Sequence, residues 1–174
     1  MRHLIILSGP INSGKTTYLH RLIAQTAQAG RSLGGITAEA VYEEGRKTGY
    51  DVQNVTTGQR RPLVRSGGQG DAGAETASAG SEAQRVGRFY LLESGLVFAR
   101  EVLQAALGME LLCLDEIGPL EIKGGGHMPA LKMLLGEYRG TLIVVAREGV
   151  AEKLSQMAKE YGWQVEMRTS GSDF

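Results

Sequence analysis

The sequence predicts an α/β protein in which helices flank a mostly parallel β-sheet. Three short runs of consecutive apolar residues, at 4–7, 111–114 and 142–146, have the composition of strands that are buried on both faces. Segments with apolar residues at helical spacing alternate with these runs, and such alternation is typical of parallel sheets. Three β-prone segments with glycine turns between them follow the first predicted helix, which indicates a β-meander inserted on the sheet.

A glycine-rich motif follows the first strand directly. Residues 9–16 read G-x-x-x-x-G-K-T, and the apolar residues after them recur at helical spacing up to position 27. Strand, glycine-rich turn and helix, in this order, predict a P-loop, in which backbone amides at the helix N-terminus face a polyphosphate. Lys15 would place its charge against the β- and γ-phosphates, and the Thr16 hydroxyl would bind Mg²⁺. The predicted nucleotide-binding residues are Gly9, Pro10, Ile11, Asn12, Ser13, Gly14, Lys15, Thr16 and Thr17.

The meander follows the first helix, which we expect Gly30 to end. Its predicted strands lie near 36–42, 50–55 and 61–64, so we interpret this part as hairpins and not as a further βαβ unit. Residues 66–81 contain alanine as their only apolar residue beside five glycines, which predicts a flexible surface loop or a mobile cover over the nucleotide.

The second half of the chain returns to the alternation of strands and helices. A short strand at 89–92 precedes a helix that Gly108 would close. Each of the two later buried strands is followed by a helical pattern, and the chain ends on a predicted edge strand. These last elements are expected near 127–138, 150–161 and 163–167.

Two carboxylates end the buried strand 111–114. Ligands of parallel sheets bind at the carboxyl ends of strands, so the P-loop, D-E-I-G at 115–118 and A-R-E-G at 146–149 should meet at one site. At the tip of a strand beside the P-loop strand, Asp115 could hold Mg²⁺, usually through water. Glu116 would point the other way and could serve as base or orienter for an attacking water. The alternative is that two acids simply end a strand.

Arg147 ends the strand 142–146 and has two interpretations. Its guanidinium could reach the γ-phosphate and stabilise charge in the transition state. It could equally be a surface arginine paired with Glu148 or Glu152. The sequence leaves both open.

Composition limits the classes of protein to which the chain can belong. We expect one domain, 1–174, because 174 residues can bury one sizeable core. The formal net charge is zero, so charge does not indicate a nucleic-acid or membrane partner, although local basic patches remain possible. No apolar stretch is long enough to span a bilayer, and a core strand at the N-terminus leaves no room for a signal peptide. The one cysteine, Cys113, makes no internal disulfide, which fits a reducing cytoplasm. We also expect a monomer.

These motifs together resemble the THEP1-type nucleoside-triphosphatases, P-loop proteins with a RecA-like core. The resemblance runs in family order from residue 9 to residue 148, in the segments GPINSGKTT, GGITAE, KTGYDV, TGQRRPL, VGRFYL, LDEIGPLE and VVARE. It implies slow Mg²⁺-dependent hydrolysis of ATP, GTP and other nucleoside triphosphates to the diphosphate. It further implies Lys15 and Thr16 on the phosphates and metal, Asp115 on the metal and Glu116 as the catalytic carboxylate. Residues 66–81 depart from the family pattern by their length.

Three functions remain compatible with the sequence. The first is a nucleoside-triphosphatase of broad base specificity, since no Asn-Lys-x-Asp motif selects guanine and Trp163 is expected to be packed. The second is a kinase that transfers the γ-phosphate to a small molecule, a nucleotide or a nucleic-acid end. The third is a regulatory switch that binds the nucleotide, against which Glu116 argues. Arginines for a kinase acceptor site, or for a solvated surface, are Arg60, Arg61, Arg65, Arg85 and Arg88.

Overall fold

One nine-stranded sheet with helices on both faces makes up the fold. The computed structural model of the chain describes residues 2–67 and 83–169. The strands are β1 (His3–Gly9), β2 (Leu33–Glu43), β3 (Arg46–Asn54), β4 (Arg60–Ser66), β5 (Ala83–Val86), β6 (Phe89–Leu92), β7 (Leu111–Ile117), β8 (Thr141–Arg147) and β9 (Gln164–Thr169). The helices are α1 (Lys15–Gln28), α2 (Glu93–Ala105), α3 (Pro119–Ile122), α4 (Met128–Glu137) and α5 (Ala151–Glu160).

The sheet has a parallel half and an antiparallel half. Its order is β5-β6-β4-β3-β2-β7-β8-β1-β9, in which β2, β7, β8, β1 and β9 pair in parallel and β3, β4, β6 and β5 pair antiparallel. The predicted α/β class is therefore confirmed. The predicted helices and the strand at 89–92 are also present, and β9 is an edge strand as expected. The short elements β5 and α3 were not predicted: β5 is exposed at every position and therefore has no apolar run, and α3 is a single turn of four residues.

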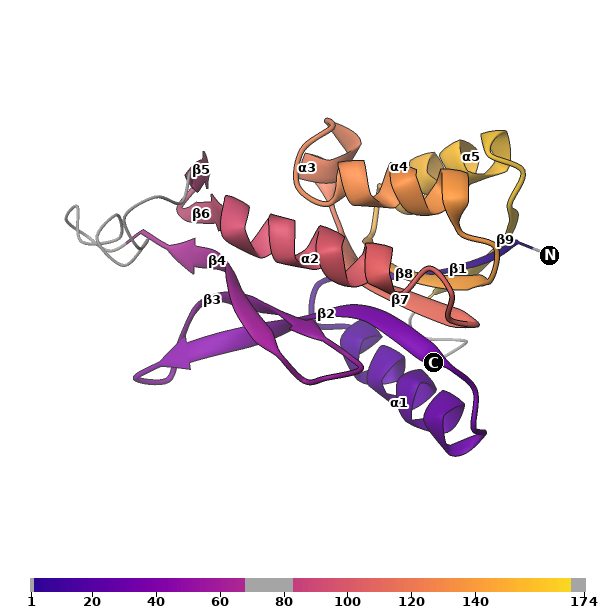
Figure 1. Cartoon of the computed structure of the whole chain (residues 1–174). Helices are drawn as coiled ribbons and strands as arrows, with labels where there is room; N and C mark the ends of the chain where they lie inside the picture. Colours follow the sequence, from indigo (N-terminus) through magenta and orange to yellow (C-terminus); the bar gives the residue numbers. More distant parts are fainter. Residues whose placement is uncertain (1, 68–82, 170–174) are drawn as a thin grey trace.

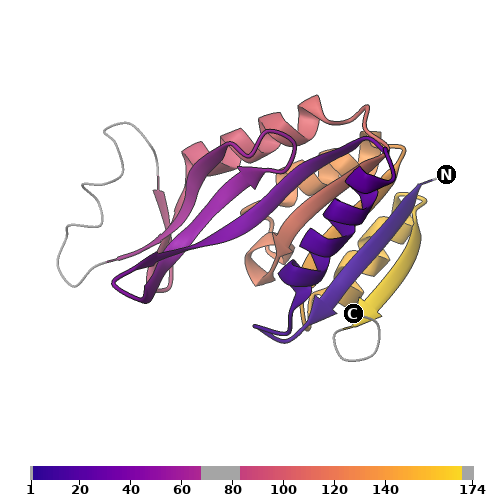
Figure 2. The same ribbon diagram turned by 90° about the horizontal axis from the view of Figure 1, so that it is seen from below.

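The central strands β1, β7 and β8 each contain a run of consecutive apolar residues because both faces of the sheet are covered. Figure 1 shows α2, α4 and α5 on one face and α1 on the other, and Figure 2 shows α1 lying along its face of the sheet between β1 and β2. In β8, Leu142 and Val144 belong to the larger core under α2, α4 and α5. Ile143 and Val145 alternate with them and pack toward α1 together with Leu19. Removing these side chains from water is the main driving force for placing the helices on the sheet.

The strand β2 belongs to both halves of the sheet, which corrects one prediction. Residues 33–36 pair in parallel with β7, whereas 36–43 pair antiparallel with β3. The segments β1, α1 and β2 therefore form a βαβ crossover, so the interpretation of the meander as hairpins alone was wrong for its first strand. The backbones approach closely here: a Cβ atom at Gly35, where φ is 117°, would overlap the backbone of Cys113. Only glycine allows this pairing.

Two further predictions concern chain segments beside this sheet. The predicted flexible loop 66–81 lies outside the described residues except for Ser66, which ends β4, and Gly67. Trp163 is packed as expected: its ring is buried, and its Nε1–H donates to the carbonyl oxygen of Leu135 at 2.8 Å. Within the two described ranges, no helix combines the length and apolarity that crossing a bilayer requires.

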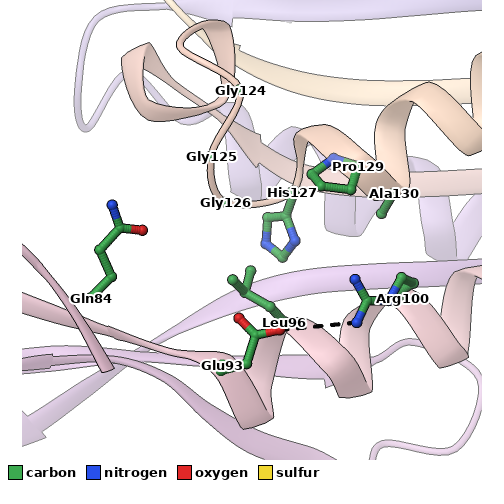
Figure 3. A pocket seen from close by; sticks show the side chains of 10 residues that line it. All are labelled: Gln84, Glu93, Leu96, Arg100, Gly124, Gly125, Gly126, His127, Pro129 and Ala130. Carbon is green, nitrogen blue, oxygen red and sulfur yellow. Dashed lines mark ion pairs between the residues drawn. The ribbon is translucent and has the colours of Figure 1, made fainter. Parts of the chain in front are cut away.

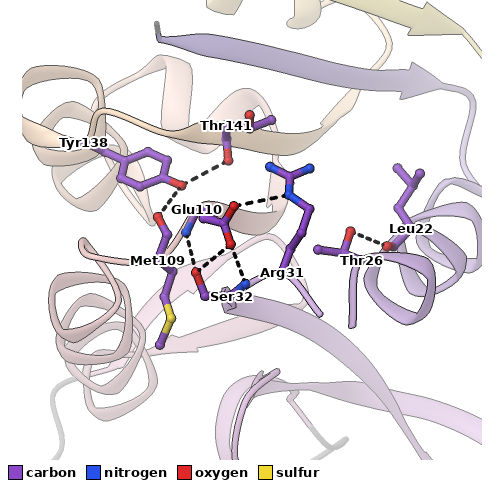
Figure 4. A network of polar contacts seen from close by, with 8 residues as sticks. All are labelled: Leu22, Thr26, Arg31, Ser32, Met109, Glu110, Tyr138 and Thr141. Carbon is purple, nitrogen blue, oxygen red and sulfur yellow. Dashed lines mark hydrogen bonds and ion pairs between the residues drawn. The ribbon is translucent and has the colours of Figure 1, made fainter. Parts of the chain in front are cut away.

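A polar network fixes the edge of the sheet at which β2 and β7 begin (Figure 4). The Glu110 carboxylate accepts hydrogen bonds from the backbone N–H of Ser32 at 2.9 Å and from its hydroxyl at 3.3 Å. The Ser32 hydroxyl oxygen in turn accepts from the Glu110 N–H, also at 2.9 Å. This carboxylate–backbone link lies at the opposite end of β7 from Asp115 and Glu116.

Candidate active site

The P-loop joins the end of β1 to the start of α1. Gly14, with φ of 85°, and Asn12, with φ of 62°, adopt left-handed conformations that turn the chain sharply into the helix. In the part of the chain that the structure describes, no side chain caps α1, so the first N–H groups of the helix are available to an anion. The Ser13 Oγ atom is buried inside the loop without a hydrogen-bond partner among these residues. An orphaned buried hydroxyl of this kind fits a ligand that supplies the partner.

The Lys15 side chain folds back over this loop. It is buried, and its ammonium donates to the carbonyl oxygens of Gly9 at 2.8 Å and Pro10 at 2.7 Å. An ammonium has three donors, so one N–H can still bind a phosphate oxygen. The loop thus combines backbone amides and one buried cation around the space where a polyphosphate would lie.

Thr16 and Asp115 meet although the strand order differs from our expectation. We predicted Asp115 on a strand beside the P-loop strand, but β8 lies between β1 and β7. The first turn of α1 spans this gap, and the Thr16 hydroxyl donates to Asp115 Oδ2 at 3.2 Å. Neighbouring oxygens around an octahedral Mg²⁺ are about 3 Å apart, so this hydroxyl–carboxylate pair fits the ion that the family implies.

The surroundings of Asp115 make its negative charge costly without a cation. The side chain is 2% exposed, and burial raises its pKa to about 7, with repulsion from Glu116 adding to the effect. Hydrogen bonds from Thr16 and from the backbone of Ala38 act in the opposite direction. Among the described residues, no group of three or more His, Cys, Asp or Glu side chains could hold a metal.

Glu116 lies at a β-bulge in β7. Asp115 pairs with Val145 and Ile117 with Ala146, which leaves Glu116 as the extra residue of β7. Its carboxylate is partly exposed and accepts a hydrogen bond from Arg147 Nε at 2.7 Å. Arg147 lies next to Gly9 in the register of the sheet, so the three segments do meet at one edge as expected.

The partner of Arg147 is a residue that neither of our two interpretations named. The sequence suggested Glu148 or Glu152 as surface partners, but the guanidinium binds Glu116. This hydrogen bond also raises the pKa of Arg147. Arg147 is thereby brought to the site, with its Nε–H committed to the carboxylate that we assigned to the attacking water.

Sequence reasoning missed two further carboxylates near this edge. Glu39 on β2 accepts a hydrogen bond from the Thr37 hydroxyl at 2.9 Å and lies 3.3 Å from His20 Nε2, and its charge contributes to the raised pKa of Asp115. Glu121 in α3 is buried beside the turn after Glu116. Glu39 lies inside the predicted strand 36–42, so the rule that ligands bind at strand ends gave no signal for it. Burial of Glu121 could not be predicted from the sequence, because it depends on the loop that folds over this residue.

A cavity of about 200 Å³ lies apart from the P-loop, between α2 and the glycine loop 124–126 (Figure 3). The His127 ring points into it from above, and Glu93 and Arg100 lie on α2 below. These two side chains form an ion pair, with 4.0 Å between Arg100 Nη2 and Glu93 Oε1. Burial lowers the pKa of His127 to about 4, so its imidazole is neutral at pH 7. Arg100 is the one arginine that lines the cavity within the described chain, and none of the arginines we had considered for an acceptor site does so.

Each of those five arginines contacts a neighbouring group of the protein. Arg65 forms an ion pair with Asp51 at 2.5 Å, and Arg60 donates to the Gln53 side chain. The others contact an aromatic ring or a backbone carbonyl. Arg61 stacks on Phe98, Arg88 lies over Phe89, and Arg85 donates to Gly87. These contacts favour the solvated-surface interpretation.

A family model described as NTPase matches residues 4–169. The nucleoside-triphosphatase THEP1 of Methanopyrus kandleri is 27% identical over 146 residues, which cover 83% of this chain and 74% of that protein. The human cancer-related nucleoside-triphosphatase is 31% identical over 149 residues, covering 82% and 73%. The chain belongs to the THEP1-type nucleoside-triphosphatase family.

Solved structures agree with this THEP1-type assignment. The solution structure of a human cancer-related nucleoside triphosphatase matches with a TM-score of 0.71 at 26% identity, covering 97% of this chain and 88% of that one. The crystal structure of THEP1 from Aquifex aeolicus matches with a TM-score of 0.65 over 95% and 90% of the two chains. At 17% identity, the second match supports the THEP1-type fold alone.

Proposed function

We propose that this member of the THEP1-type family hydrolyses nucleoside triphosphates to the diphosphate and phosphate, with Mg²⁺ and with broad base specificity. One observation carries the proposal: the P-loop, the Thr16–Asp115 pair and the Glu116–Arg147 pair lie at a single edge of the sheet. Phosphoryl transfer to water requires a phosphate-binding loop, oxygen ligands for a cation and a carboxylate that orients the water.

Substrate binding would rest on the P-loop. The N-terminal amides of α1 and the Lys15 ammonium would hold the β- and γ-phosphates, and Thr16 and Asp115 would hold Mg²⁺. When bound, Mg²⁺ neutralises charge on the phosphate oxygens. The Thr16 hydroxyl could keep donating to Asp115, because a lone pair of its oxygen remains for the ion.

Glu116 and Arg147 would act on the transferred group. Glu116 Oε1 accepts from Arg147, which leaves Oε2 to orient the attacking water and to take its proton. A guanidinium has five N–H donors, so those of Arg147 beyond Nε–H can approach the γ-phosphate and stabilise its developing charge. The ion pair would thus keep the orienting carboxylate and the charge-stabilising cation in a fixed relation.

Broad base specificity is supported by the surface around the P-loop. Ile11, within the P-loop, is 70% exposed, and its side chain offers no hydrogen-bonding group to a base edge. Trp163 packs on Tyr138 in the core and is therefore not a stacking platform. A site that binds the phosphates and makes no hydrogen bond to the base would accept ATP, GTP and other nucleoside triphosphates alike.

The test measures phosphate release from ATP, GTP, CTP and UTP, each with Mg²⁺ and with EDTA, and in the presence of nucleosides, nucleotides and 5′-hydroxyl oligonucleotides. We expect Mg²⁺-dependent release from all four nucleotides within about one order of magnitude of each other, independent of acceptor. Transfer of phosphate to an acceptor faster than its release to water would contradict hydrolysis and favour the kinase. Release from one nucleotide only would contradict broad base specificity.

A further inference from the structure

The Glu121 carboxylate joins two segments that follow β7. It is 7% exposed, and its Oε2 accepts a hydrogen bond from the backbone N–H of Gly118 at 2.8 Å. Its Oε1 accepts from the backbone N–H of His127 at 3.2 Å. One buried carboxylate therefore ties the turn at the end of β7 to the far end of the glycine loop. Hydrogen bonds to an ionised carboxylate are stronger than those between neutral groups, so the ionised Glu121 would hold the Gly118 turn and the His127 backbone strongly together.

The turn held in this way contacts the Glu116–Arg147 pair. Gly118 comes two residues after Glu116, and a Cβ atom at Gly118 would lie 3.5 Å from Arg147 Cδ and 3.6 Å from Glu121 Oε2. Gly118 is thus packed between the Arg147 side chain and the Glu121 carboxylate. The charge of Glu121 also contributes to the raised pKa of Arg147. A shift of Glu121 would move the turn on which both members of the pair depend.

The glycine loop, 124–126, packs closely against the Glu121 carboxylate at one of its glycines. A Cβ atom at Gly126, where φ is 54°, would overlap Glu121 Oε1. At Gly124, where φ is 94°, a Cβ atom would meet nothing within 4 Å. The loop is therefore closed against Glu121 at one glycine and open at the other, which provides a matched pair of positions for an experiment.

We infer that Glu121 is a positioning residue that acts through the Gly118 turn to hold Glu116 and Arg147 in the geometry of the reaction. A buried carboxylate is costly, and burial raises the pKa of Glu121 against the hydrogen bonds that lower it. A neutral cap would hold α3 without this cost. The inference rests on the proposed role of Glu116 in orienting water.

Glu121→Gln tests the inference because it keeps the size of the side chain but replaces one acceptor oxygen by an amide. One of the two backbone N–H groups, at Gly118 or His127, then loses its partner. We expect kcat for Mg²⁺–ATP to fall about tenfold, with the dissociation constant of a fluorescent ATP analogue unchanged within about twofold. The control is Glu110→Gln, which weakens the equivalent carboxylate–backbone link at the opposite end of β7 and should leave kcat unchanged.

The glycine pair tests the same contact from the other side. Gly126→Ala should lower kcat as Glu121→Gln does, because the new methyl group displaces Oε1. Gly124→Ala carries the same kind of backbone strain without that contact, so it should lower the melting temperature but not kcat. Equal losses of kcat in both alanine variants would overturn the inference, because backbone strain alone would then explain them.

A double-mutant cycle separates positioning from stability. If Glu121 acts through Glu116, Glu121→Gln should change the residual rate of Glu116→Gln by less than about twofold. An undiminished tenfold loss in that background would overturn the inference while leaving the proposed function intact. A Glu116→Gln variant as active as the natural protein would instead contradict the proposed role of Glu116, so the two failures are distinguishable.

Discussion

Replacing Asp115 by asparagine should make the metal-free protein more stable, and increasingly so as the pH rises. Asp115 is buried, and burial raises its pKa from 3.8 to about 7. The asparagine carries no charge, and its side-chain oxygen can accept from one of the two present donors, the Thr16 hydroxyl and the Ala38 N–H. The Thr16 hydroxyl can also turn and accept from the new amide group. The exchange therefore removes a costly charge without opening a cavity.

The size of the effect follows from the two pKa values. Below pH 3.8 the Asp115 carboxyl is protonated in the folded and the unfolded chain, so it costs nothing. At higher pH the unfolded chain releases a proton that the folded protein keeps, and stability falls until the folded group also ionises near pH 7. At about 1.36 kcal/mol for each unit of pKa difference, the penalty is about 2 kcal/mol at pH 5 and about 4 kcal/mol at pH 8.

Urea denaturation in EDTA at pH 5 and pH 8 measures this difference. The advantage of Asp115→Asn in the free energy of unfolding should grow by about 2 kcal/mol between these values. Glu110→Gln is the control of opposite sign: its hydrogen bond from Ser32 lowers the pKa of Glu110, so that variant should be less stable than the natural protein at pH 8 and approach it as the pH falls. A pH-independent advantage for Asp115→Asn, or a loss at pH 8, would refute the reasoning.

The same variant connects stability with metal binding. Mg²⁺ with a non-hydrolysable ATP analogue should raise the melting temperature of the natural protein more than that of Asp115→Asn, because a ligand stabilises according to its affinity for the folded state. Asp115→Asn should also need more Mg²⁺ for half-maximal ATP hydrolysis. An unchanged Mg²⁺ requirement would contradict the assignment of Asp115 to the metal.

Three other substitutions test the P-loop, the water-orienting carboxylate and the fold. Lys15→Ala should abolish binding of a fluorescent ATP analogue with little change in the circular dichroism spectrum; unchanged turnover would contradict the P-loop assignment. Glu116→Gln should bind Mg²⁺–ATP but hydrolyse it at least about a hundredfold more slowly in single turnover, and a defect confined to binding would show that the role is wrong. Gly35→Ala should lower the free energy of unfolding by at least about 2 kcal/mol in urea, because the methyl group overlaps the backbone of β7; a smaller loss would mean that the sheet adjusts there.

The sequence by itself determined the parts of this protein that depend on near neighbours. The P-loop is a local structure: its glycines, its lysine and the helix start lie within eight residues, 9–16, so their spacing predicts the turn. Strands buried on both faces reveal themselves as continuous apolar runs, and β1, β7 and β8 were predicted for that reason. Glu121 left no such signal, because its burial depends on the loop that folds over it.

Only the tertiary structure decided how these parts meet. The place of β8 between β1 and β7 depends on how the helices cover the two faces of the sheet, and no local pattern encodes that order. The contact between Thr16 and Asp115 spans 99 positions, and the Arg147–Glu116 pair depends on a bulge that appears only when β7 and β8 are in register. Contacts between distant residues are set by the packing of whole elements, and packing is a property of the assembled core.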